Sequence, residues 1–347
     1  MRARSPRISR SVSLGASALA AVALLALTGC VANAPAGADP ALTVDSSADG
    51  CSVSASEVPA GSYFTSCKPG MVGDGIGKAA FTVTPNESGA VVNSDLDEQV
   101  ATADLNYSSY VKDQIAQLVT GTDAFTAAYV SGDFDSARGL YAATRMHWER
   151  VETVAESFGD LDPKLDLREA DLEEGREWTG WHAIEKDLWP QEAEAGFAAY
   201  SAEKRTSLAE QLVADTATLN GKVQNLTFGL AQQTNGAIGL LDEVASGKVT
   251  GEEEFWSHTD LWDFQANIDG AQVLYAGVRD ILLATDADLA DSLDSEFAAL
   301  QVLLDAQRVG DGFTLYTDLT PAEIRALADQ VNALAEPLNQ LTAALIL

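Results

Sequence analysis

Residues 110–129 read YVKDQIAQLVTGTDAFTAAY, and the pattern in this stretch decides the fold. Apolar side chains recur in it every three or four positions, at Tyr110, Ile115, Leu118, Phe125 and Tyr129. That spacing places them on one face of an α-helix. Gly132 follows shortly and predicts the end of the helix, because glycine is a common stop signal.

The helical pattern continues to the end of the chain. From about residue 94 onward proline is rare, and Ala, Leu, Glu, Asp and Gln dominate. Further apolar stripes predict helices over residues 134–158, 167–189, 202–225, 229–246, 259–283, 286–308 and 321–346. Pro321 suits the first position of the last helix. About eight helices with short links predict an all-α bundle.

The first 29 residues have the features of an export signal. Four arginines precede an apolar run over residues 12–27, which is shorter than a typical membrane span. The run ends in Leu27-Thr28-Gly29-Cys30, which resembles a bacterial lipobox. We therefore expect residues 1–29 to be removed and Cys30 to carry a lipid that anchors an exported protein to the outer face of the cell membrane. An ordinary signal peptide with a chance cysteine is the alternative.

Residues 30–40 are rich in Ala, Gly and Pro, which predicts a linker. Residues 41–93 predict a short, incomplete β segment, because β-like runs alternate there with Gly, Pro and Asp. Four such strands are too few to close a β-sandwich. In an exported chain, Cys51 and Cys67 favour a disulfide. Coordination of a soft metal by Cys67 and Met71 is the alternative.

The charge of the chain excludes several kinds of partner. The formal net charge is -31, whereas a nucleic-acid-binding protein needs a surface rich in Lys and Arg. An acidic polysaccharide would be repelled for the same reason. A strongly acidic surface is suited to binding cations, or simply to keeping an exported protein soluble.

Acidic residues and one histidine gather between residues 149 and 185. Glu149 and Glu152 are three residues apart and so share a helix face, as do His182 and Glu185. Asp166 lies between the two pairs. Helical bundles bind metals with pairs of this kind, and mixed carboxylate and imidazole ligands suit iron, zinc, manganese or copper. Solvated glutamates and a hydrogen-bonded His–Glu contact in the core are the structural alternatives.

The three histidines have different surroundings. His182 is close in sequence to Trp178, Trp181 and Trp189, which predicts a buried environment. His147 is about 200° from Glu149 around a helix, so we expect it to lie on another face. His258 is expected to cap or orient the helix that begins near residue 259, and is a second-rank ligand candidate.

Residues 180–185 (GWHAIE), 147–164 and 257–270 together resemble segments of the EfeO/imelysin family of bacterial iron-uptake lipoproteins. Residues 180–185, GWHAIE, resemble the Gly-x-His-x-x-Glu signature of the imelysin domain. Residues 147–164 and 257–270 resemble the segment before this signature and a segment of the second half. The resemblance implies an imelysin-like helical domain over residues 94–347. Residues 41–93 resemble the two ends of a cupredoxin-like domain without its middle; they contain no histidine for a type 1 copper site.

The resemblance also implies a function. It implies an exported, non-enzymatic protein that binds iron (Fe²⁺ or Fe³⁺), with zinc or copper as alternatives in the same site. Its implied partners, in an EfeUOB-type uptake system, are a membrane iron permease and a haem peroxidase. The implied metal ligands are Glu149, Glu152, Asp166, His182 and Glu185, with Glu243 or one of Glu252 to Glu254 from the second half. The alternatives are an imelysin-like metallopeptidase, disfavoured because the chain lacks His-Glu-x-x-His, and a purely structural bundle.

Overall fold

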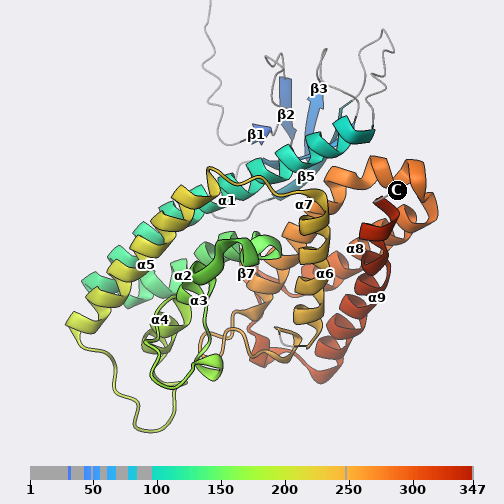
Figure 1. The fold of residues 1–347 in the computed structure, drawn as a ribbon. Helices are drawn as coiled ribbons and strands as arrows, with labels where there is room; N and C mark the ends of the chain where they lie inside the picture. Colours follow the sequence, from blue (N-terminus) through green and yellow to red (C-terminus); the bar gives the residue numbers. More distant parts are fainter. Residues whose placement is uncertain are drawn as a thin grey trace, which may run out of the picture.

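The computed structural model describes residues 30–32, 43–47, 50–54, 61–67, 77–83, 96–246 and 248–345. Most of them are helical, which confirms the predicted all-α class (Figure 1). The α-helices are α1 (Leu96–Ser131), α2 (Phe134–Glu149), α3 (Asp162–Leu165), α4 (Trp181–Leu188), α5 (Ala202–Val223), α6 (Leu230–Ser246), α7 (Asp260–Thr285), α8 (Ala287–Asp305) and α9 (Pro321–Leu345). Short 3-10 helices lie between them: η1 (Glu152–Leu161), η2 (Glu169–Asp171), η3 (Lys248–Thr250) and η4 (Tyr316–Asp318). Within the described part of the chain, no helix is both long and apolar enough to cross a membrane.

The apolar stripe of the first helix forms part of the core. Ile115, Leu118, Phe125 and Tyr129 are fully buried, where α1 packs against α2 and α5. The helix ends before Gly132, which adopts a φ of 81° that glycine tolerates at little cost. Asp133 then caps α2 by accepting a hydrogen bond from the backbone N–H of Ser136.

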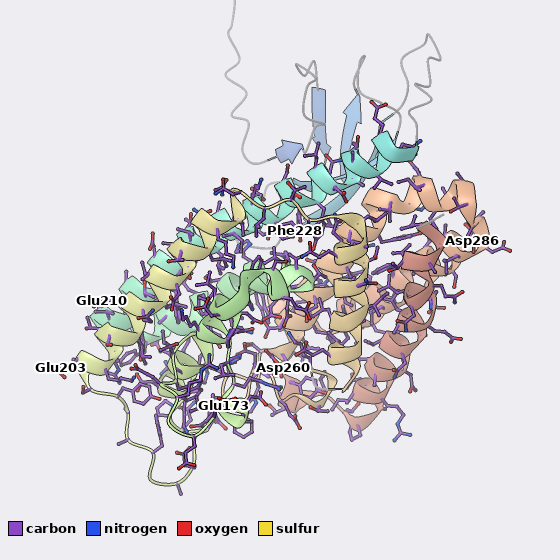
Figure 2. All side chains as sticks on the ribbon, viewed as in Figure 1. Glu173, Glu203, Glu210, Phe228, Asp260 and Asp286 are labelled. Carbon is purple, nitrogen blue, oxygen red and sulfur yellow. The ribbon has the colours of Figure 1, made fainter. Side chains whose placement is uncertain are left out.

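Helix α7 lies at the centre of the bundle, where it packs against α1, α2, α6, α8 and α9. Unlike an ordinary core helix, it carries polar side chains that are at most 3% exposed: Asp260, Asp263, Gln265, Asn267 and Asp269. Figure 2 shows Asp260 within the bundle, whereas Glu203 and Glu210 lie on the outer side of α5. Because burying unpaired polar groups is costly, this helix marks the part of the core where a function is to be sought.

The helix predicted over residues 134–158 is shorter than expected. Helix α2 ends at Glu149, and the chain continues as η1. Gly159 has a φ of 64° within this segment, which an α-helix does not allow. Pro163 then lies at the start of α3, where its missing N–H group is tolerated.

The helix predicted over residues 167–189 is wrong for most of its length. Only residues 181–188 form an α-helix, and most of residues 166–180 lie in a loop that contains η2. Gly175 and Gly180 have φ values of 84° and 88°, which interrupt a helix. The glutamates of this loop favour helix formation, but the loop offers no continuous apolar face to pack, and packing supplies most helical stability.

Four short strands lie within the predicted β segment of residues 41–93, and a fifth, β1 (Cys30–Ala32), lies at the start of the predicted linker. Strand β4 (Gly61–Cys67) pairs antiparallel with β1 and β5 (Gly77–Val83), and β2 (Thr43–Ser47) pairs with β3 (Gly50–Ser54). A hairpin of β6 (Arg308–Val309) and β7 (Gly312–Phe313) follows α8. The expected leader (1–29), most of the linker (30–40), and the side chains of Cys30, Cys51 and Cys67 lie outside the described residues. Lipidation, the disulfide and the cupredoxin-like remnant therefore stay predictions.

Two glycines set how closely the central helices approach the end of α2. A Cβ at Gly270 of α7 would overlap the backbone carbonyl of Arg150. A Cβ at Gly236 of α6 would overlap the backbone carbonyl of Thr153. Both glycines are therefore needed for the backbone contacts that hold residues 149–153 against α6 and α7.

Gly270→Ala is expected to lower the free energy of unfolding by about 1–3 kcal/mol, because the added methyl group meets backbone and not a movable side chain. Gly221→Ala in α5 is a matched control, since nothing lies within 4 Å of a Cβ there. This control should stabilise the protein by roughly 0.5–1 kcal/mol through helix propensity. Denaturant unfolding of both variants measures the difference; equal stability would refute the close approach.

Candidate metal centre

A tight crossing places His182 beside Asp166. Gly180, at the N-terminus of α4, has a φ of 88°, and a Cβ there would overlap the backbone carbonyl of Leu165. The chain therefore passes directly over the end of α3, where Asp166 follows as the C-cap residue. In this way α3 and the first turn of α4 present a carboxylate and an imidazole to the same space.

His182 is surrounded by carboxylates and is 1% exposed, which confirms the predicted burial. Its Nδ1 lies 3.1 Å from Glu185 Oε2. Its Nε2 lies 3.4 Å from Asp166 Oδ1 and 3.6 Å from Glu253 Oε1. The ligand atoms of Asp166, His182 and Glu253 lie within 4.8 Å of one another, as do those of His182, Glu185 and Glu254.

Glu185 is already fully engaged by the protein. Its Oε1 accepts hydrogen bonds from the backbone N–H groups of Trp256 and Ser257, at 2.9 and 2.7 Å. Its Oε2 is the partner of His182 Nδ1. A carboxylate that holds one imidazole nitrogen fixes the tautomer and leaves the other nitrogen free to bind a metal. This geometry favours Glu185 as the residue that orients His182, with Nε2 facing Asp166 and Glu253.

Arg145 of α2 supplies a buried positive charge at the centre of this cluster. Its guanidinium is completely buried and lies within ion-pair distance of five carboxylates, those of Glu149, Asp166, Glu253, Glu254 and Asp263. The planar fork of arginine suits contacts with several carboxylates. Arg145 thereby links α2, α3, α7 and the segment before α7.

Lys248 supplies a second buried positive charge. Its Nζ lies 2.7 Å from Glu149 Oε2 and 2.6 Å from Glu152 Oε2. Asn267 of α7 donates to the same two oxygens, at 3.0 and 2.8 Å. Glu149 ends α2 and Glu152 begins η1, so the two do not lie on one helix face as predicted, but both side chains are directed at Lys248 and Asn267.

The carboxylates that face His182 Nε2 are ionised. Burial opposes the ionisation of Asp166, but the charge of Arg145 and the nearby imidazole of His182 outweigh it and lower its pKa. Burial likewise opposes the ionisation of Glu253, and the charge of Lys248 with the His182 contact lowers its pKa to about 2. Both side chains thus offer negatively charged oxygens at neutral pH, as a metal ligand must.

Two carboxyl groups beside Arg145 that do not line the cavity, Glu254 and Asp263, have raised pKa values. Burial, with the nearby charge of Glu185, raises the pKa of Glu254 to about 8. Burial and the nearby Glu254 also raise the pKa of Asp263. His182 Nε2 and Asp263 Oδ2 make no hydrogen bond, whereas Glu254 Oε1 and Asp263 Oδ1 face Arg145 Nε at 2.5 and 3.6 Å. Buried polar atoms without such partners are rare and often mark a position that an ion or water serves.

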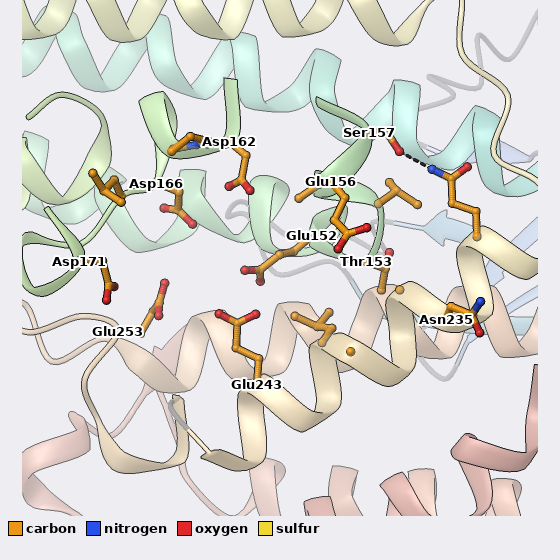
Figure 3. Close-up of a pocket in the computed structure, with 18 of the residues that line it drawn as sticks. Glu152, Thr153, Glu156, Ser157, Asp162, Asp166, Asp171, Asn235, Glu243 and Glu253 are labelled. Atoms are coloured by element: carbon orange, nitrogen blue, oxygen red, sulfur yellow. Dashed lines mark hydrogen bonds between the residues drawn. The ribbon is translucent and has the colours of Figure 1, made fainter. Parts of the chain in front are cut away.

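A cavity of about 570 Å³ opens beside the cluster, between α6 and the segment from η1 to η2 (Figure 3). Its wall is strongly acidic and includes Glu152, Glu156, Asp162, Asp166, Asp171, Glu243 and Glu253. Asp166 and Glu253 therefore belong both to the cavity wall and to the group around His182. A cation that enters this cavity meets the ionised carboxylates of Asp166 and Glu253.

The structure separates the predicted second-half candidates. Glu243 lies on α6 in the cavity wall, outside the ligand groups found among the described residues. Glu253 and Glu254 are buried and belong to one ligand group each. Glu252 is exposed. The second half thus contributes two carboxylates to the cluster where the sequence predicted one.

The other two histidines lie apart from the cluster. His147 is buried, and its Nδ1 lies 2.9 Å from Gln114 Oε1, so it packs on another face as predicted. His258 directly precedes the N-cap residue of α7. It adopts a φ of 58°, and its Nε2 lies 3.7 Å from Glu192.

Four residues of the cluster were not predicted to belong to a site: Arg145, Lys248, Asn267 and Asp263. Arg145 carries a weak local signal, because it is four residues before Glu149 and so shares its helix face. Lys248 and Asn267 meet Glu149 across 99 and 118 residues of sequence. Contacts of that separation leave no periodic pattern in the chain.

Comparison with known proteins agrees with this architecture. The family model described as imelysin, which is classed by name among peptidases, matches residues 103–341. The chain belongs to the EfeO/imelysin family. It is 41% identical to the "Iron uptake system component EfeO" of Escherichia coli K12 over 238 residues, which are 68% of this chain and 61% of that protein. The chain thus spans about three fifths of the length of this relative.

Two further relatives extend the comparison. An "Efem/EfeO family lipoprotein" of Staphylococcus haemolyticus is 40% identical over 68% of this chain and 80% of its own length. The crystal structure of a protein described as an iron-regulated protein A precursor, from Parabacteroides distasonis, matches with a TM-score of 0.57. That match covers 74% of this chain and 97% of the other at 15% identity, and so supports the fold alone.

In the presence of a chelator, the stability of the protein is expected to fall as pH rises from about 5 to about 8. Glu254, with its pKa raised from 4.5 to about 8, holds a proton in the folded state that the unfolded chain releases. The stabilisation is therefore complete below the unfolded pKa and is lost as pH rises through the folded value. One such proton gives a slope of up to about 1.4 kcal/mol per pH unit.

Denaturant unfolding at several pH values measures this slope. Glu254→Gln should flatten it, because the amide does not titrate. Glu210→Gln, at an exposed position of α5, should leave it unchanged. An equally steep slope in the Glu254 variant would show that other groups cause the pH dependence.

Proposed function

We propose that this chain captures iron outside the cytoplasm as the metal-binding component of an iron uptake system. The observation that carries the proposal is the meeting of Asp166, His182 Nε2 and Glu253 at the wall of an acidic cavity. Ionised oxygens and one imidazole form a hard to intermediate ligand set, which suits iron better than it suits a soft, thiolate-seeking metal. The cavity gives an ion access from solvent.

The names of the relatives support the same role. Proteins that are about 40% identical over the helical part are described as an iron uptake system component and as a lipoprotein. By this likeness, a lipid on Cys30 holds the protein at the outer face of the membrane. A membrane iron permease receives the ion, and a haem peroxidase acts in the same EfeUOB-type system. Zinc or copper would compete for the same ligands.

The residues have distinct roles in this proposal. Asp166, His182 and Glu253 bind the ion, and Glu185 orients the imidazole. Glu149 is buried beside Lys248, and Glu152 contacts the same lysine from the cavity wall. Glu243 lines the cavity through which the ion arrives. In this role the protein is a carrier and not an enzyme, since capture and release of the ion change only metal–ligand bonds and convert no substrate into a product.

A metallopeptidase is the second candidate, because the imelysin family is classed by name among peptidases. Catalytic zinc sites commonly combine two or three imidazoles with an open position for water. Each ligand group found among the described residues contains a single histidine, His182. Peptide cleavage by the zinc-loaded protein, abolished by His182→Ala, would favour this candidate over the carrier.

Calorimetric titration of the chelator-treated protein with ferrous, ferric, zinc and cupric ions tests the carrier. His182→Ala and Glu253→Gln are expected to weaken iron binding by at least roughly 10- to 100-fold, the range seen even for residues that only support a metal ligand. Glu185→Gln should fall within that range, because its single amide oxygen cannot accept from both Nδ1 and the two backbone N–H groups, so the imidazole is held less firmly. Helical circular dichroism should stay nearly unchanged in all three variants.

Glu252→Gln is the matched control. Glu252 directly precedes Glu253 but is exposed, and its substitution removes the same charge. Its iron affinity should equal that of the unmodified protein. Unchanged affinity in folded His182→Ala protein would overturn the proposed ligand set and leave the His–Glu pair as a structural contact.

A further inference from the structure

Lys248 occupies a position that is built to hold a cation. Its ammonium lies between Glu149 and Glu152, at 2.7 and 2.6 Å, and 3.9 Å from Glu253 Oε1. Its side chain is 1% exposed, so the ammonium itself is shielded from solvent. Asn267 holds Glu149 and Glu152 from the opposite helix. Three carboxylates from three segments thus converge on one positive charge.

This position is not independent of the ligands around His182. Glu253 Oε1 lies 3.6 Å from His182 Nε2 and 3.9 Å from Lys248 Nζ, and so faces both. An ion bound by Asp166, His182 and Glu253 would share Glu253 with the ammonium. Two positive charges at such short range in a buried site repel each other strongly.

The two buried cations differ in how easily they can move. Arg145 lies within α2, and its guanidinium contacts five carboxylates at once. Lys248 begins the three-residue helix η3 between α6 and α7, and presents one ammonium on a flexible four-carbon stem. Arg145 is therefore the fixed counter-charge, and Lys248 is the one that can be exchanged.

The acidic cavity offers the ammonium a place to go. Two of its partners, Glu152 and Glu253, line the cavity, as does Glu243 near the end of α6 (Figure 3). Glu243 and Lys248 lie only five residues apart on either side of the end of α6. A rotation of the lysine stem would bring the ammonium from the buried carboxylates into this acidic space.

We propose that Lys248 is a tethered counter-cation that competes with the incoming metal ion for Glu149, Glu152 and Glu253, and moves into the cavity when the ion binds. The inference rests on the proposed metal binding at His182 and deepens it. The lysine keeps buried carboxylates compensated when no ion is present, since unpaired buried charges are strongly destabilising. Its return to the carboxylates favours release of the ion, which a carrier requires.

Acetylation of lysines in the unmodified protein tests the displacement directly. An N-hydroxysuccinimide ester of acetate is applied with and without saturating ferrous or zinc ion, and labelling is read by mass spectrometry. Lys248 should be protected without the ion and labelled at least about tenfold faster with it. Lys164, 43% exposed, should be labelled in both conditions, and Lys186, 5% exposed, should be protected in both.

A variant tests the competition independently. Lys248→Gln should bind iron at least about tenfold more tightly, equivalent to about 1.4 kcal/mol, and release it to a chelator correspondingly more slowly. Lys164→Gln removes the same charge from an exposed ion pair with Asp160 and should change neither quantity. Circular dichroism reports whether the Lys248 variant is folded; if it is not, the labelling of the unmodified protein decides.

The outcomes separate the two proposals. Iron binding by calorimetry with Lys248 still protected would overturn the displacement while leaving the metal site standing. Equal affinity and release in folded Lys248→Gln protein would also overturn it. Failure of the unmodified protein to bind any of the ions would overturn the proposed function and the competition together.

Discussion

The buried guanidinium of Arg145 is the interaction on which the centre of the bundle depends. It joins carboxylates from α2, the end of α3, the segment before α7 and α7 itself. Removing one partner of a buried ion pair costs about 3–5 kcal/mol, because the remaining charges lose their compensation. Without this one positive charge, the acidic side chains from these segments would repel one another, and the helices could not close around His182.

The position of Arg145 also divides the cluster into two sides. Toward the cavity, Asp166 and Glu253 have lowered pKa values and are ionised. Away from the cavity, Glu254 and Asp263 have raised pKa values and retain protons more readily. A cation that reaches Asp166 and Glu253 therefore meets charged oxygens, while the inner carboxyl groups add little repulsion to the core. Burial also raises the pKa values of Glu152, Asp162 and Glu243 in the cavity wall. This asymmetry makes one face of the cluster a binding surface and the other a part of the core.

The sequence predicted the features that depend on local pattern and missed those that depend on distant contacts. The stripe of Phe125 and Tyr129 predicted a buried helix face, and the tryptophans near His182 predicted its burial; both are confirmed. The helix predicted over residues 167–189 forms only at residues 181–188, because the preceding residues offer no continuous apolar face to pack. Lys248 gave no signal, since its partners lie nearly a hundred residues away.

The His182–Glu185 pair shows why spacing alone cannot assign ligands. An i, i+3 pair brings the two side chains close enough to bond to each other, and here Glu185 holds Nδ1 while two backbone N–H groups hold Glu185. The same bond would form in a purely structural contact. What distinguishes the two cases is the opposite edge of the imidazole: Nε2 makes no hydrogen bond and faces Asp166 and Glu253 beside the acidic cavity. Those neighbours come from segments that only the folded chain brings together.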